Sequence, residues 1–121
     1  MPKKILVAED HDESRFFLVK FIQNLGYEVI EATTGTEAVT KAIAEEPKLI
    51  FMDLGMPKLT GLDAARVLTK NPITAHIPII AYSAWNVAQF ERQTQEAGIV
   101  AYLEKPVSMD LIRSTIEKFI K

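Results

Sequence analysis

The chain has 121 residues, of which 48% are hydrophobic, and this length and composition suit one compact domain. Fourteen Lys and Arg residues oppose sixteen Asp and Glu residues, and the formal net charge of -2 argues against binding to nucleic acid or to an anionic membrane surface. The absence of cysteine excludes a disulfide framework, and with two histidines a zinc site is not expected. The first apolar run, residues 5–8, is too short for a signal peptide or a membrane span, so we expect a cytoplasmic protein.

Short apolar runs predict the β-strands. Four of them are almost continuously apolar, which is typical of strands covered by helices on both faces. They are residues 5–8, 49–52, 77–82 and 100–103. A fifth run, residues 28–31, alternates apolar and charged side chains and is interpreted as an edge strand.

Helical patterns follow each of these runs. The first contains residues 18–25 and ends at Gly26, and the second begins at a possible capping box, Thr34 to Glu37. The others cover residues 62–70, residues 86–97, which are the most polar, and a last helix from Met109. Five strand-helix repeats predict a five-stranded parallel sheet with helices on both faces, an α/β fold. A ligand site in such a fold lies beyond the carboxyl ends of the strands.

Polar side chains follow four of the predicted strands. They are Glu9 and Asp10, then Asp53, then Ser83, then Lys105. Three carboxylates on neighbouring strand ends repel one another, so we expect a cation there. Carboxylate oxygens with room for water suit Mg²⁺, whereas a plain salt bridge between Asp10 and Lys105 is the alternative.

An aspartate beside Mg²⁺ and a lysine can attack a phosphoryl group, because the cations neutralise charge on the transferring oxygens. Asp53 follows the middle strand, and we predict that it is this nucleophile. Lys105 and the Ser83 hydroxyl would then donate hydrogen bonds to the phosphoryl oxygens.

Together these residues resemble the receiver domain of two-component response regulators, of the single-domain, chemotaxis-regulator-like type. The resemblance covers nearly the whole chain and rests on four motifs. They are Glu9-Asp10, the segment DLGMP at 53–57 with Gly61, Ser83-Ala84 and Lys105-Pro106.

The resemblance implies a flavodoxin-like doubly wound fold with strand order 2-1-3-4-5. It implies that a histidine kinase or a histidine phosphotransfer protein phosphorylates Asp53. Mg²⁺ would be held by Asp10, Asp53 and the backbone carbonyl of Gly55, with Glu9 acting through a metal-bound water. Ser83 and Lys105 would hold the phosphoryl oxygens, and the Lys105-Pro106 peptide would be cis.

The resemblance also implies a switch. Ser83 would move toward the phosphoryl group, and Tyr102 would turn inward into the space that it leaves. A downstream protein would then bind the surface formed by the helix at 86–97, the strand at 100–103 and the last helix. Trp85 lies near the site and could shield the phosphate, belong to a docking surface, or pack as a half-exposed indole on the helix at 86–97.

We therefore expect residues 1–121 to form one receiver domain without an output domain, which catalyses only its own phosphorylation and dephosphorylation. One alternative is a pseudo-receiver that acts purely as a binding module. Another is a Mg²⁺-dependent phosphohydrolase of the haloacid-dehalogenase-like class, which is disfavoured because that class carries its acid after the first strand, whereas the expected nucleophile here follows the third, and no cap insertion is present. A flavin mononucleotide carrier is disfavoured because the loop after the first strand is acidic.

Overall fold

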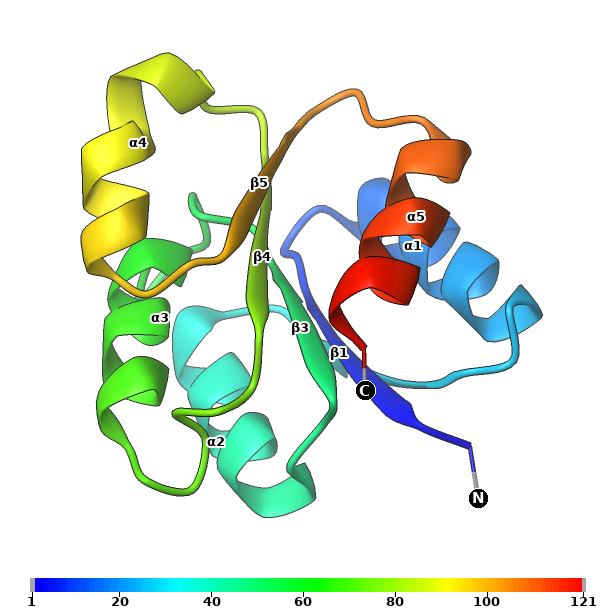
Figure 1. The fold of residues 1–121 in the computed structure, drawn as a ribbon, viewed down its shortest axis with the longest axis horizontal. Helices are drawn as coiled ribbons and strands as arrows, with labels where there is room; N and C mark the ends of the chain where they lie inside the picture. The colour runs from blue at the N-terminus through cyan, green and yellow to red at the C-terminus, as the bar shows by residue number, and fades with distance from the viewer. Residues whose placement is uncertain (1, 121) are drawn as a thin grey trace.

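The strands of this computed structural model, which describes residues 2–120, form one parallel sheet in the order β2-β1-β3-β4-β5. The predicted flavodoxin-like α/β fold is confirmed. Strands and helices alternate along the whole described chain (Figure 1). They are β1 (Lys4–Ala8), α1 (Asp12–Asn24), β2 (Glu28–Ala32), α2 (Gly35–Glu45), β3 (Leu49–Met52), α3 (Gly61–Lys70), β4 (Ile79–Ser83), α4 (Val87–Glu96), β5 (Ala101–Glu104) and α5 (Met109–Phe119).

Two apolar cores lie on opposite faces of the sheet. Alternate residues of a strand point to opposite faces, so Leu6 and Ala8 enter one core while Ile5 and Val7 enter the other. Helices α2, α3 and α4 lie on one side of the sheet, and α1 and α5 lie on the other (Figure 1). Because both faces are covered, the strand ends are left as the place where polar side chains can gather.

Local sequence signals explain where the helices begin. The predicted capping box of α2 is present: the N–H of Glu37 donates to Thr34 Oγ1 at 3.0 Å, and the Glu37 carboxylate accepts from the N–H of Thr33 at 2.8 Å. Helix α1 begins after His11, whose ring nitrogen accepts from the N–H of Ser14. Helix α4 buries only Thr94, in agreement with its polar sequence.

The third strand has its predicted bounds, the first and second are each one residue longer than predicted, and the fourth and fifth differ from the prediction at both ends. The strand predicted at 77–82 begins at Ile79, because Pro78 has no N–H and the N–H of Ile77 donates to Thr74 in the preceding turn. The strand predicted at 100–103 is β5 at Ala101–Glu104. Both strands therefore end one residue later than predicted, and Ser83 is the last residue of β4. Within residues 2–120, no helix has the length and the hydrophobicity needed to cross a membrane.

Candidate functional site

The ends of β1 and β3 bring three carboxylates together. The backbone N–H of Asp53 donates to Ala8 at 2.9 Å, which fixes the end of β3 beside the end of β1. One carboxylate oxygen each from Glu9, Asp10 and Asp53 lies within 4.8 Å of the other two. Glu9 is 1% exposed and Asp53 9% exposed, whereas Asp10 faces solvent. The acidic cluster expected from the strand ends is thus present.

Lys105 reaches this cluster from β5. Its backbone N–H donates to Ser83 at 2.8 Å, and its side chain then pairs with Glu9 and places Nζ 3.5 Å from Asp53 Oδ2. The alternative of a plain Asp10–Lys105 salt bridge is wrong, because the ammonium pairs with the two buried carboxylates, Glu9 and Asp53, and not with the exposed Asp10. The Lys105-Pro106 peptide is cis, as the resemblance implies.

Burial and charge set the protonation of this group. Burial of Glu9, together with its hydrogen bond to Asp53, raises its pKa to about 7 against the opposing effect of Lys105. Burial acts to lower the pKa of Lys105, but the hydrogen bond that its ammonium donates to Glu9 and the charge of Asp53 outweigh it and raise that pKa. Three carboxylates gather here beside the one ammonium of Lys105, which pairs with two of them.

The loop after Asp53 packs tightly around it. The N–H of Gly55 donates to Asp53 Oδ1 at 3.1 Å, and the N–H of Gly61 donates to Leu54 at 3.1 Å. A Cβ atom on Gly61 would stand 2.0 Å from the Asp53 carbonyl oxygen. A glycine is thus required at position 61, beyond the DLGMP segment, by close backbone approach.

Ser83 and Tyr102 meet at the backbone of Trp85. Ser83 is 1% exposed, and its hydroxyl oxygen accepts a hydrogen bond from the N–H of Trp85 at 3.2 Å. The Tyr102 hydroxyl donates to the carbonyl of Trp85 at 2.9 Å. The Trp85 indole is partly buried and packs on Phe90 of α4, with ring centroids 4.6 Å apart, so the packing on this helix is present, and shielding of the phosphate and a docking role stay predictions.

The oxygen donors of the cluster fit Mg²⁺. The three carboxylates offer hard oxygen ligands and no sulfur or imidazole, which is the donor chemistry that Mg²⁺ prefers. The exposed position of Asp10 leaves one side of the cluster open to water. Three other predicted site residues, Gly55, Ser83 and Tyr102, are not part of the cluster itself.

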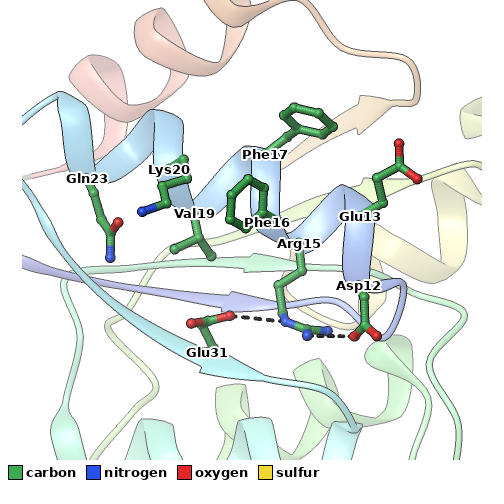
Figure 2. A pocket seen from close by; sticks show the side chains of 9 residues that line it. All are labelled: Asp12, Glu13, Arg15, Phe16, Phe17, Val19, Lys20, Gln23 and Glu31. Carbon is green, nitrogen blue, oxygen red and sulfur yellow. Dashed lines mark hydrogen bonds and ion pairs between the residues drawn. The ribbon is translucent and has the colours of Figure 1, made fainter.

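One feature beside the site does not follow from the apolar pattern used to predict α1. Phe16 and Phe17 fall outside the stripe at 18–25, and their side chains are 57% and 60% exposed. They line a pocket of about 670 Å³ on α1, which Figure 2 shows together with the Arg15 guanidinium between Asp12 and Glu31. The sequence contains a signal for this surface. Phe16 and Phe17 are adjacent, and two adjacent residues of a helix cannot both belong to one buried stripe.

Comparisons with known proteins show which family and fold this chain shares. The polar-differentiation response regulator DivK of Brucella anthropi is 32% identical over 120 residues, which is 99% of this chain and 98% of that protein. The receiver domain of the sensor histidine kinase PA1611 from Pseudomonas aeruginosa, with a magnesium ion coordinated in its active site cleft, superposes with a TM-score of 0.91 at 28% identity over 98% of each chain.

The fold is also that of the chemotaxis protein CheY4 of Vibrio cholerae, with a TM-score of 0.93 at 23% identity over 99% of this chain and 100% of that one. The response regulator receiver domain family matches residues 5–117. This match covers all the site residues named above. The chain belongs to the response regulator receiver domain family.

Proposed function

We propose that this protein accepts a phosphoryl group on Asp53 from a histidine kinase or a histidine phosphotransfer protein, and that it then changes a protein-binding surface. The observation that carries the proposal is the position of Asp53. Its carboxylate lies at the end of the central strand β3, with Lys105 Nζ 3.5 Å away and two further carboxylates in the same cluster.

The reaction needs a carboxylate oxygen of Asp53 to attack the phosphorus of a phosphohistidine. The new O–P bond gives an acyl phosphate, the N–P bond breaks, and the imidazole nitrogen of the donor leaves and takes up a proton. Lys105 is placed to donate to the phosphoryl oxygens, and the Ser83 hydroxyl is free to donate its proton once it turns toward them. Its own phosphorylation and dephosphorylation are the only reactions that we propose for it.

We propose that Asp10 and Asp53, with the carbonyl of Gly55, hold Mg²⁺, and that Glu9 acts through water. The excess of negative charge around Glu9 supports a cation at this place. When bound, Mg²⁺ supplies charge neutralisation for the phosphoryl oxygens.

The phosphodonor docks, in this proposal, on the α1 surface of Figure 2. Phe16 and Phe17 are exposed there, and α1 begins two residues after Asp10, so a partner on this surface reaches the acidic cluster. A contiguous apolar contact of this kind is typical of a protein-binding site. Phe17→Ala should slow transfer from a phosphorylated histidine phosphotransfer domain and leave phosphorylation by acetyl phosphate unchanged.

The downstream partner binds, in this proposal, the surface of α4, β5 and α5. Val100, Met109 and Leu111 are exposed on or beside these elements, at 51%, 59% and 47%. Phosphorylation can change this surface only through contacts that differ between the two states. Ser83 and Tyr102, which share the backbone of Trp85, are the groups that can supply such a difference.

The test is phosphorylation of the purified protein by acetyl phosphate with Mg²⁺, followed by mass spectrometry. We expect one acid- and base-labile phosphoryl group, which is lost in Asp53→Asn and in EDTA. The matched control is Asp12→Asn, because the Asp12 side chain is 91% exposed and lies outside the cluster.

Each other outcome favours a different function. A phosphoryl group on another residue, or one undiminished in Asp53→Asn, would contradict the proposal. Turnover of a free phosphoester would favour the phosphohydrolase, and failure to accept any phosphoryl group would favour the pseudo-receiver.

A further inference from the structure

A second concavity lies at the end of the sheet opposite Asp53. It has a volume of about 890 Å³, and its walls come from the loops that precede β3, β4 and β5 and from the last turn of α5. In a parallel sheet these loops all lie at the amino ends of the strands, so this amino-end pocket is separate from the acidic cluster at the carboxyl ends. Nothing in the proposed phosphotransfer uses it.

The inner surface of the amino-end pocket is apolar and firmly held. Pro47 and Ile77 are buried, and Phe119 is partly buried beside them. The walls are fixed by backbone hydrogen bonds: Lys48 donates to Lys4 at 2.8 Å, and Val100 donates to Ile79 at 3.0 Å. The pocket is therefore formed by the fold itself and does not depend on a ligand to create it.

The rim of the pocket carries more positive than negative groups. Lys48 and Lys118 are exposed there with His76, and Glu46 is the one carboxylate among the lining residues. Within residues 2–120 neither lysine takes part in an ion pair, whereas Lys4, for example, is paired with Glu45. The Lys118 ammonium stands 5.3 Å from the centre of the Phe119 ring, directly above the apolar surface.

We propose that the amino-end pocket binds a small organic anion with an apolar body and one carboxylate, sulfonate or phosphate group. The apolar body would lie against Val100 and Phe119, above the buried Ile77, and the anionic group would lie between the lysines of the rim. The volume is that of a site for a molecule of this size. The rim favours an anion because its two lysines outnumber its one carboxylate, although the whole chain has a net charge of -2.

Neither half of such a ligand suffices alone. Exposed lysines bind a bare anion only weakly, because water screens the charges. A neutral apolar molecule gains contact with the pocket but leaves both ammonium groups without a partner. The structure thus predicts that affinity requires both parts in one molecule.

The test is a titration of the isotope-labelled full chain with anilinonaphthalene sulfonate, followed by amide NMR. Shifts are expected at Ile77, Val100 and Phe119. Lys48→Ala and Lys118→Ala should each weaken binding about fivefold without changing the spectrum of the free protein elsewhere. The matched control is Lys20→Ala, which removes an exposed ammonium from the other pocket, on α1, and should leave the affinity unchanged.

Two further probes separate the parts of the ligand. Phenylnaphthylamine, which lacks only the sulfonate, and inorganic sulfate should each bind more weakly than the dye by about tenfold or more. Equal binding of the neutral compound, shifts confined to the surroundings of Phe16, or an affinity insensitive to both lysines would overturn the proposal. Asp53→Asn should bind the dye like the wild type, so the result stands apart from the outcome of the phosphorylation assay.

Discussion

The indole of Trp85 lies directly over the backbone of Gly55, with Nε1 3.4 Å from the position that a Cβ atom on Gly55 would occupy. The same indole stacks on Phe90 of α4, and the backbone N–H of Trp85 donates to the Ser83 hydroxyl. One residue thus contacts the loop after Asp53, the hydroxyl at the end of β4 and helix α4. The space around Gly55 and Gly61 determines which substitutions the loop after Asp53 tolerates.

The two loop glycines should respond differently to alanine. A methyl group on Gly55 would meet a side chain at van der Waals distance, whereas one on Gly61 would stand 2.0 Å from the carbonyl oxygen of Asp53, which is backbone and cannot move aside. In urea unfolding we expect Gly61→Ala to lower the free energy of unfolding by about 2 to 4 kcal/mol. Gly55→Ala, the matched control, should cost less than about 1 kcal/mol. Equal losses would show that the loop yields at both positions.

Glu9 should make stability depend on pH. Burial raises its pKa in the folded protein to about 7, above its ordinary value near 4.5. Between these two values the folded state binds the proton more tightly than the unfolded state, so the free energy of unfolding falls as the pH rises through this window. In EDTA, the free energy of unfolding of the wild type should fall by on the order of 2 kcal/mol relative to that of Glu9→Gln as the pH rises through this window.

Urea unfolding at a series of pH values checks this prediction. Glu13→Gln is the matched control, because Glu13 is exposed and lies outside the acidic cluster. Its pH curve should run parallel to that of the wild type. A Glu9→Gln curve that also runs parallel would contradict the assigned pKa.

The sequence predicts much of the fold because its strands are covered on both faces. Continuous apolar runs mark such strands clearly, and parallel topology then brings Glu9, Asp53 and Lys105 to one edge. The apolar pattern does not show which of the polar side chains after a strand is buried. Glu9 is buried and Asp10 is exposed, although both carboxylates belong to the cluster, and it is the buried one that pairs with Lys105.

The start of β4 and the surroundings of Trp85 did not follow from the apolar pattern. Strand β4 begins at Ile79 because the N–H of Ile77 is bound in a turn, and an apolar run does not record such a turn. For Trp85 the sequence left packing on the helix at 86–97 as one of three roles, and the structure shows this packing through the contact with Phe90. Local preference alone does not determine which neighbours a side chain meets.

Tyr102 should contribute a single hydrogen bond to the folded state. Its hydroxyl donates to the carbonyl of Trp85 at 2.9 Å, and Tyr102→Phe leaves that carbonyl without this donor. We expect a loss of about 0.5 to 1.5 kcal/mol in the free energy of unfolding. Tyr27→Phe is the matched control, because the structure gives the Tyr27 hydroxyl no hydrogen bond within residues 2–120. A variant as stable as the control would mean that water replaces the tyrosine without cost.

Mg²⁺ should stabilise the protein through the acidic cluster. The three carboxylates lie within 4.8 Å of one another, so a bound cation relieves their repulsion in the folded state and has no equivalent site in the unfolded chain. At a Mg²⁺ concentration a hundred times the dissociation constant, the gain is about 2.7 kcal/mol, seen as a higher thermal midpoint that EDTA reverses. Asp10→Asn should lose most of this gain and should not lower the midpoint of the metal-free protein, because it removes one of the repelling charges at an exposed position. Asp12→Asn, two residues away and outside the cluster, should keep the full response; if Asp10→Asn keeps it as well, Asp10 is not a ligand.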